Sequence, residues 1–176
     1  YENIIEKICP PLARFAAIDY PLSAGDDPCV FQLKYGKVSS LVCFDSIYET
    51  LCLDGVRNGS ELILVSTNDS WFAGSPALRQ HNLQTVLRCV ENGRYGVRAA
   101  NTGISSIITP NGEITASLGD GEKGYVSGEV RMISDMTFYD RVGNVIVPIG
   151  IIYLIITALF AVFTKKTGKE NGILDR

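Results

Sequence analysis

The sequence predicts a layered α/β or α+β domain over residues 1–144, one transmembrane helix over residues 145–163, and a tail over residues 164–176. Three observations support this fold class. Short apolar segments typical of strands alternate with segments of helical periodicity. Residues 61–67, "ELILVST", form a continuous apolar run, as expected for a strand buried on both faces. Finally, nineteen residues near the C-terminus carry no charge.

The first part of the chain, residues 1–30, is expected to be irregular because it contains four prolines and the turn cluster "SAGDDP". Residues 30–33 and 38–43 are expected to form strands on either side of a turn at residues 34–37. A helix is expected over residues 46–56, a strand over residues 61–67, and then a loop containing "NDSWFAG".

The next element is a long helix that begins at Ser75-Pro76, with serine as the N-cap and proline at the first helical position, and ends near residue 95. Its periodicity groups four apolar side chains on one face of the helix. They are Leu83, Val86, Leu87 and Val90. On the same helix, Arg88, Glu91 and Arg94 have the spacing of an ion-pair ladder.

Strands are expected over residues 97–100, 104–109, 113–118 and 125–130. The dipeptide Asn111-Gly112 predicts a hairpin between the second and third of these strands. The preceding segment Asn101-Thr102-Gly103 is expected to hold a tight backbone next to the loop at residues 68–74.

Composition excludes several classes of function. The net charge of −3 is too small and of the wrong sign for a nucleic-acid-binding protein. None of the five cysteines lies in a C-x-x-C motif, and the single histidine, His81, has no zinc-ligand spacing, so we expect no metal and no cofactor. His81 itself is expected to be a hydrogen-bonded structural residue. The chain opens at Tyr1 in what reads as the middle of a domain, so we expect further sequence upstream.

The uncharged segment over residues 145–163 predicts a membrane-spanning helix. At 1.5 Å per residue a helix of this length spans roughly 28 Å, close to the thickness of the hydrocarbon core. Lys165, Lys166 and Lys169 follow it directly. The positive-inside rule therefore places the tail in the cytoplasm and residues 1–144 on the extracytoplasmic side.

In the stretch "LVCFDSIYE", residues 41–49, Cys43 stands at the end of an apolar strand and is soon followed by polar residues. Two interpretations are open at this point. Cys43 is either a small buried core residue, which is the commoner role of a free cysteine, or a nucleophile presented at a strand-to-helix turn.

Three blocks together carry a resemblance: "LVCFDSIYE", the pattern "NDSWF…QH…R…E..R…R..NTG" over residues 68–103, and the terminal apolar segment. The chain resembles the C-terminal part of the carbon–nitrogen hydrolase (nitrilase-like) domain of the apolipoprotein N-acyltransferase family. This resemblance implies an αββα sandwich with a Glu-Lys-Cys catalytic triad. Cys43 matches the nucleophile, whereas the glutamate and the lysine would lie upstream of Tyr1.

The resemblance also implies an activity on the extracytoplasmic face of the bacterial cytoplasmic membrane. A fatty acyl chain passes from a phospholipid to Cys43 as a thioester, and then to the α-amino group of S-diacylglyceryl-cysteine in an apolipoprotein. Phe44 and Asp45 stand where the family often has tyrosine and glutamate, positions associated with substrate binding. Trp71 matches a candidate wall of the lipid pocket.

Two other functions remain open at this point. A membrane-tethered nitrilase-type amidohydrolase would use water in place of the acceptor amine. A catalytically inactive, membrane-anchored module would bind lipid or a partner without chemistry, and the absence of a suitable glutamate and lysine from these 176 residues would agree with it.

Overall fold

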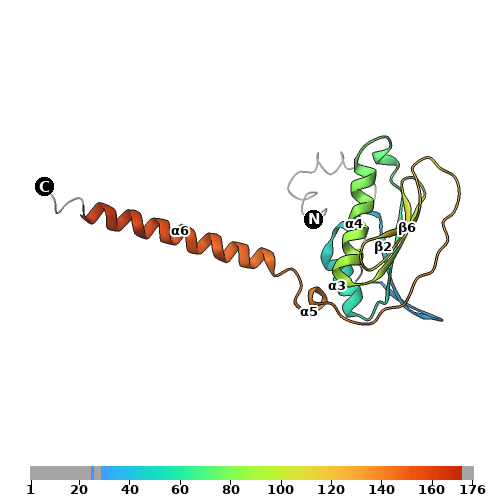
Figure 1. The fold of residues 1–176 in the computed structure, drawn as a ribbon, viewed down its shortest axis with the longest axis horizontal. Helices are drawn as coiled ribbons and strands as arrows, with labels where there is room; N and C mark the ends of the chain where they lie inside the picture. Colours follow the sequence, from blue (N-terminus) through green and yellow to red (C-terminus); the bar gives the residue numbers. More distant parts are fainter. Residues whose placement is uncertain (1–24, 26–28, 172–176) are drawn as a thin grey trace.

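A single mixed sheet forms the centre of the computed structural model, which describes residue 25 and residues 29–171, with side chains up to residue 161 (Figure 1). Its six strands lie side by side in the order of the sequence. The strands β2, β3 and β4 are parallel, and the other neighbouring pairs are antiparallel. The strands are β1 (Val30–Leu33), β2 (Gly36–Val42), β3 (Leu62–Thr67), β4 (Tyr95–Ala100), β5 (Ser105–Ile108) and β6 (Ile114–Leu118).

Two crossover connections join the parallel strands. The first contains the 3₁₀ helix η1 (Cys43–Ile47) and α3 (Glu49–Arg57), and the second contains η2 (Ser70–Phe72) and α4 (Ala77–Asn92). The helices α3 and α4 contact each other and cover one face of the sheet (Figure 1). Because β2, β3 and β4 are parallel, their carboxyl ends meet at one edge, and the loops that follow them gather there.

The apolar core lies between α3 and the sheet. Leu41 on β2, Ile63 and Val65 on β3, and Cys52 on α3 form one buried cluster. Each buried aliphatic side chain of this size contributes about 1.5–3 kcal/mol relative to an exposed one. These contacts fix the end of β2, and therefore the place where the chain leaves the sheet at residue 43.

Most of the expected elements are present with shifted ends. The helix expected over residues 46–56 is divided, because Tyr48 is extended (φ −83°, ψ 108°) and separates η1 from α3. The hairpin at Asn111-Gly112 joins β5 to β6 as expected. The second helix begins one residue later than expected, although the Ser75 hydroxyl still accepts a hydrogen bond from the Ala77 N–H.

The apolar face of α4 is not its buried face. Leu83, Leu87 and Val90 are 43%, 48% and 48% exposed, so the apolar stripe points away from the sheet. The buried face is largely polar and includes His81, Asn82, Thr85, Arg88 and Asn92. This arrangement is stable because the polar atoms find partners: the Ser106 hydroxyl on β5 donates to Asn82, and Arg98 on β4 donates to Thr85.

The helix α4 lies very close to the sheet at Gly96 on β4. A Cβ atom built there would overlap the Sγ atom of Cys89. Only a residue without a side chain therefore allows this approach, which brings the polar face of α4 within hydrogen-bonding reach of β4 and β5.

The strand expected over residues 125–130 is not present, and the segment is irregular. Gly128 packs against Ile107, where an added Cβ atom would lie 3.0 Å from the Cδ1 atom of Ile107. The segment therefore packs against a face of the sheet. To form the backbone hydrogen bonds of a strand, it would have to lie along an edge of the sheet instead.

After this segment the chain is attached to the domain through α5 (Phe138–Val142). The Thr137 hydroxyl caps α5 by accepting from the Asp140 N–H, and it also donates to the Glu91 carbonyl of α4. Arg57 on α3 donates to the Asp140 carbonyl at 2.8 Å. These bonds fix the point from which the last helix departs.

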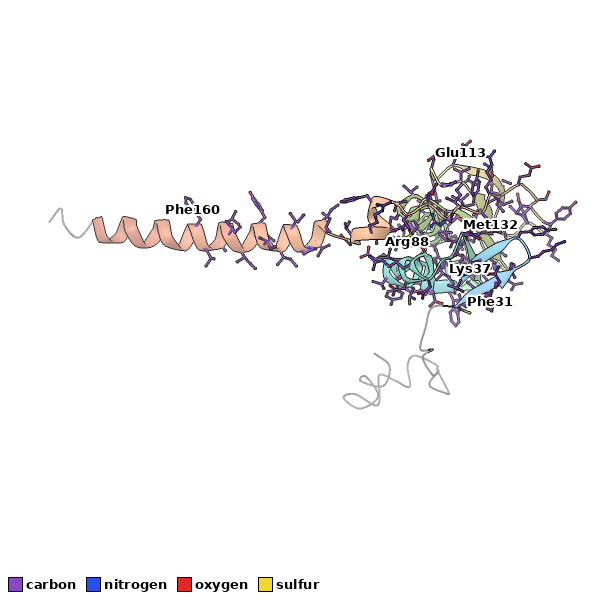
Figure 2. The ribbon with its side chains drawn as sticks, turned by 90° about the horizontal axis from the view of Figure 1, so that it is seen from below. Phe31, Lys37, Arg88, Glu113, Met132 and Phe160 are labelled. Carbon is purple, nitrogen blue, oxygen red and sulfur yellow. The ribbon has the colours of Figure 1, made fainter. Side chains whose placement is uncertain are left out.

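The last helix, α6 (Ile146–Asn171), projects away from the sheet, and its side chains up to residue 161 point outward, as at Phe160 in Figure 2. Among the residues that the structure describes, no helix combines the length and the apolar character needed to cross a membrane. The span expected over residues 145–163 therefore stays a prediction. The expectations for residues 1–24 and for the end of the tail lie outside the described residues.

Candidate active site

Cys43 lies at the carboxyl end of β2, where the backbone takes an unusual conformation. Its φ angle is +53°, which makes Cys43 the one non-glycine residue of the described chain with a positive φ. The left-handed conformation costs an L-residue about 1–2 kcal/mol. Strain of this kind is typical of functional turns and persists only where the surrounding contacts enforce it. Cys43 is half-buried and its thiol is free.

Three side chains hold the backbone of this turn. The Asp45 carboxylate accepts a hydrogen bond from the Val42 N–H at 2.9 Å. The Ser46 hydroxyl donates to the Cys43 carbonyl oxygen, also at 2.9 Å. The Nε2 atom of His81 on α4 lies 3.2 Å from the same carbonyl oxygen and 3.3 Å from the Ser46 hydroxyl. The carbonyl of Cys43 is therefore fixed from two directions.

His81 belongs to a buried polar network behind the turn. Its Nδ1 atom lies 2.9 Å from the Asp69 carboxylate, whose other oxygen accepts from Arg98 on β4 at 2.7 Å. The Thr67 hydroxyl at the end of β3 donates to Asp69 at 2.6 Å. Asp69 is fully buried and Arg98 almost so, so their opposite charges compensate each other away from water.

Two opposing effects act on the pKa of Asp69. Burial alone raises it, but the hydrogen bond from Thr67, the charge of Arg98 and the hydrogen bonds from Arg98 and His81 outweigh burial, so the pKa lies below its usual range. Asp69 is consequently ionised at neutral pH and accepts hydrogen bonds from all three neighbours.

The segment Asn101-Thr102-Gly103 holds a tight backbone next to the loop that carries Asp69, as the sequence predicted. The Thr102 carbonyl accepts from the Asp69 N–H at 2.9 Å, and the Asn101 N–H donates to the Thr67 carbonyl at 2.9 Å. At Gly103, φ is +109°, and an added Cβ atom would lie 2.7 Å from the Oδ2 atom of Asp69. Gly103 thus permits both the backbone conformation and the close approach to Asp69.

We expect Gly103→Ala to lower the free energy of unfolding by about 3 kcal/mol, because backbone strain of about 1 kcal/mol adds to steric overlap with a buried carboxylate. Gly121→Ala is the matched control. Gly121 also has a positive φ (+76°), but no atom lies within 4 Å of the added Cβ, so only the strain is expected. Chemical denaturation of the two variants measures the difference, and equal losses would contradict the contact with Asp69.

A cavity of about 490 Å³ lies beside the Cys43 turn. Its walls combine aromatic and aliphatic side chains with two amides of α4, and they comprise Phe44, Ile47, Phe72, Ala77, Gln80, His81 and Gln84. The rings of Phe44 and Phe72 lie 5.8 Å and 6.0 Å from the His81 ring, measured between centroids. His81 therefore lines the cavity and also belongs to the polar network.

The structure brings the candidate site residues only partly together. Cys43, Phe44 and Asp45 follow one another in η1, and Phe44 lines the cavity. Trp71 lies on η2 at the same edge of the sheet, but its side chain is 88% exposed and does not line the cavity. The neighbouring Phe72 lines it in its place.

The other described cysteines differ from Cys43 in their surroundings. Burial raises the pKa of the Cys89 thiol to about 12, and it raises the pKa of Cys52 still further. Both thiols are therefore protonated at neutral pH and poorly nucleophilic. Cys29 is exposed just before β1, where its carbonyl accepts from the Ser40 N–H of β2. Among these thiols, only that of Cys43 lies at the turn beside the cavity.

The ion-pair ladder expected on α4 is half confirmed. Arg88 pairs with Glu91 at 2.9 Å. Arg94 does not join them, because its guanidinium is buried beyond the end of α4 and donates to the carbonyls of Ser60, Asn92 and Asp135. Arg94 thus attaches the segment before α5 to the domain.

Three residues of the network escaped the sequence analysis: Ser46, Asp69 and Arg98. Arg98 was detectable in principle, since a charged residue within a strand otherwise composed of small and apolar residues requires a buried partner. Asp69 directly follows the carboxyl end of the buried strand β3, which was a second indication. The expectation of a hydrogen-bonded structural role for His81 is confirmed.

The fold agrees with comparisons to known proteins. The model of the carbon–nitrogen hydrolase family matches residues 5–134. The chain therefore belongs to the carbon–nitrogen hydrolase family. In structure it is similar to a branch 10 member of the nitrilase superfamily from Saccharomyces cerevisiae, with a TM-score of 0.50 and 25% identity over 58% of this chain and 40% of that one. A nitrilase-like α/β fold with a mixed sheet is thus confirmed.

Within this family, the curated relatives of high similarity are named apolipoprotein N-acyltransferases. The relative from Geobacter metallireducens is 39% identical over 79% of this chain, and the relative from Shewanella oneidensis is 30% identical over 82% of it. The chain spans 27% of the length of each of these relatives. The resemblance to the apolipoprotein N-acyltransferase family is therefore confirmed over a limited part of the complete proteins.

Proposed function

We propose that these residues are the C-terminal part of a membrane acyltransferase that uses Cys43 as its nucleophile. The donor is a phospholipid, and the acceptor is the α-amino group of S-diacylglyceryl-cysteine at the start of an apolipoprotein. The observation that carries this proposal is the free thiol of Cys43 at the end of β2, in a strained turn beside a cavity with both apolar and amide side chains. The names of the curated relatives support the choice of donor and acceptor.

The reaction has two steps. In the first, the Cys43 thiolate attacks the ester carbonyl of the phospholipid, the ester C–O bond breaks, and the lysophospholipid leaves with a proton. In the second, the acceptor amine attacks the thioester, the C–S bond breaks, and the amine loses a proton as the thiolate leaves. A thioester suits this task because an amine attacks it more readily than it attacks an ester.

Cys43 requires help to ionise, since an unassisted thiol has a pKa near 8.5. We assign this help to a glutamate and a lysine upstream of Tyr1, which would complete a Glu-Lys-Cys triad. The partly exposed face of the sheet opposite α3 and α4 favours such an upstream part. Leu64 on β3 and Val97 on β4 are paired in register on the face opposite to α3 and α4, and both are only half-buried. The second half of an αββα sandwich would cover them.

The substrate-binding residues are assigned by position. Phe44 lines the cavity and is proposed to contact the acyl chain. One oxygen of Asp45 accepts from the Val42 N–H, so we propose that Asp45 shapes the turn as well as contacting the substrate. Trp71, with most of its indole exposed at the same edge, is proposed to contact lipid.

We place the helix over residues 145–163 in the bacterial cytoplasmic membrane, with residues 1–144 outside and the tail over residues 164–176 in the cytoplasm. Two observations support this topology. The segment carries no charge and is followed by three lysines. In the described part of α6, apolar side chains such as Ile149, Ile152 and Leu159 are exposed, and lipid would cover them.

A transfer assay tests the proposal. The full-length protein in detergent is given a phospholipid with a labelled acyl chain and a synthetic peptide that begins with S-diacylglyceryl-cysteine. We expect the label on the peptide amine, together with released lysophospholipid. Labelled free fatty acid without labelled peptide would instead indicate a hydrolase, and release of ammonia from simple amides would indicate an amidohydrolase. Binding of lipid without either product would indicate an inactive module.

A further inference from the structure

The strained turn at Cys43 needs a rigid support, and the polar network behind it has the geometry of one. The network extends from Arg98 on β4 through Asp69 to His81 on α4, and ends at the Cys43 carbonyl oxygen. Each of its distances lies between 2.7 and 3.2 Å. It thus joins three structural segments to the one described non-glycine residue with a positive φ.

The position of His81 is itself fixed from several sides. Asp69 accepts at the Nδ1 edge of the ring, and the Cys43 carbonyl oxygen can only accept at the Nε2 edge, so the two contacts together require an N–H on each ring nitrogen. Phe44 and Phe72 lie within about 6 Å of the ring on the cavity side. The Nε2 edge then points at the Cys43 carbonyl and at the Ser46 hydroxyl, which also donates to that carbonyl. The ring cannot turn without breaking the contact with buried Asp69.

Stability alone is a weak explanation for such a network. A buried ion pair gains little over well-packed apolar residues, because removing two charges from water is costly. Holding the Cys43 turn in one position is a benefit separate from folding stability. A displacement of 1 Å of a reacting group can lower a rate by about 100-fold. Contacts that restrict the Cys43 backbone can therefore matter far more for rate than for folding.

We propose that His81, held in place by Asp69 and Arg98, is a positioning residue that fixes the Cys43 turn through the Cys43 carbonyl oxygen and Ser46. The proposal rests on the proposed function of Cys43 as the nucleophile. His81 does not exchange a proton with the substrate in this account. His81 keeps the Cys43 thiol at the position from which the thiol attacks the substrate. Ser46 adds a second hydrogen bond to the Cys43 carbonyl oxygen.

Two substitutions at His81 test the contacts of Nδ1 and of Nε2 separately. In His81→Asn the amide lies where Nδ1 was, so the contact with Asp69 is retained and the contact with the Cys43 carbonyl is lost. In His81→Gln the amide reaches the position of Nε2, so the contact with the turn is retained and that with Asp69 is weakened. Both variants are similar in polarity, and both remove the ring from the cavity wall.

The test measures two rates in the full-length protein. The first is the single-turnover rate of acylation of Cys43 by phospholipid. The second is the rate of alkylation of Cys43 by iodoacetamide, followed on the peptide that contains Cys43. We expect His81→Asn to lower both rates by about tenfold or more, whereas His81→Gln stays within about threefold of the wild type. The melting temperatures of the two variants should not follow this order.

Equal losses in the two variants, losses that follow the melting temperatures, or no loss in either would overturn the proposal. If neither variant reaches the membrane, Ser46→Ala decides in their place. A loss of about threefold or more in both rates would support the proposal, and unchanged rates would overturn it. Absence of acylation in the wild type would refute the proposed function alone, since the alkylation rates still report on the position of Cys43.

Discussion

Replacing Cys43 with alanine is expected to abolish acyl transfer, with a loss of at least about 10⁴-fold in rate. The reason is chemical: without the thiol no thioester forms, and the remaining groups can only bind the donor and acceptor. The melting temperature of the full-length protein should change little, because Cys43 is half-buried and its strained turn is held through its backbone. The transfer assay with labelled phospholipid measures the loss.

Cys29→Ala is the matched control for this experiment. Its thiol is also free, but it is exposed just before β1 and outside the turn that begins at Cys43. We expect it to retain the wild-type rate. If Cys43→Ala kept a few per cent of the activity, or if Cys29→Ala lost it, the assignment of Cys43 as the nucleophile would be wrong.

The second large effect concerns the buried carboxylate of Asp69. We expect Asp69→Asn to lower the free energy of unfolding by about 3–5 kcal/mol, because the Arg98 charge is left buried without a compensating charge. Asp54→Asn is the control, since Asp54 is exposed on α3 and its loss should cost no more than about 0.5 kcal/mol. Urea denaturation of the full-length protein measures both values.

The effect of Asp69→Asn should depend on pH in a defined direction. The native pKa of Asp69 is lowered, so the stabilisation by its charge is complete above the unfolded-state value of about 3.9. It is lost as the pH falls below that value and through the native pKa. The difference between the wild type and Asp69→Asn should thus be constant from pH 5 to 8 and shrink below about pH 4. A difference that shrinks as the pH rises would contradict this account.

Much of the sheet could be predicted from local sequence. The apolar run of β3 and the Asn111-Gly112 turn are determined by short-range physics, namely burial on both faces and the preference of a tight hairpin for positive φ. The turn at Cys43 could be located for the same reason, because a strand ends there against a polar segment. Its left-handed backbone could not be foreseen, since cysteine has no preference for that conformation.

The orientation of α4 could not be predicted from its pattern. An apolar stripe of Leu83, Leu87 and Val90 normally indicates the buried face. The opposite face is buried here because Arg98 and Ser106 on the neighbouring strands supply partners for its polar side chains. Such a match depends on which strands pair, and therefore on long-range contacts. The contacts between His81, Asp69 and Arg98 could not be predicted for the same reason, because they join residues that are far apart in the sequence.

The most direct test of the central claim is the intact mass of the full-length protein purified from its membrane, measured before and after treatment with neutral hydroxylamine. Thioesters are cleaved by this reagent, whereas amides are stable. We predict a mass increase of the size of a fatty acyl chain that hydroxylamine removes and that is absent in Cys43→Ala. An unmodified Cys43 in the presence of supplied phospholipid would contradict acyl transfer through this residue.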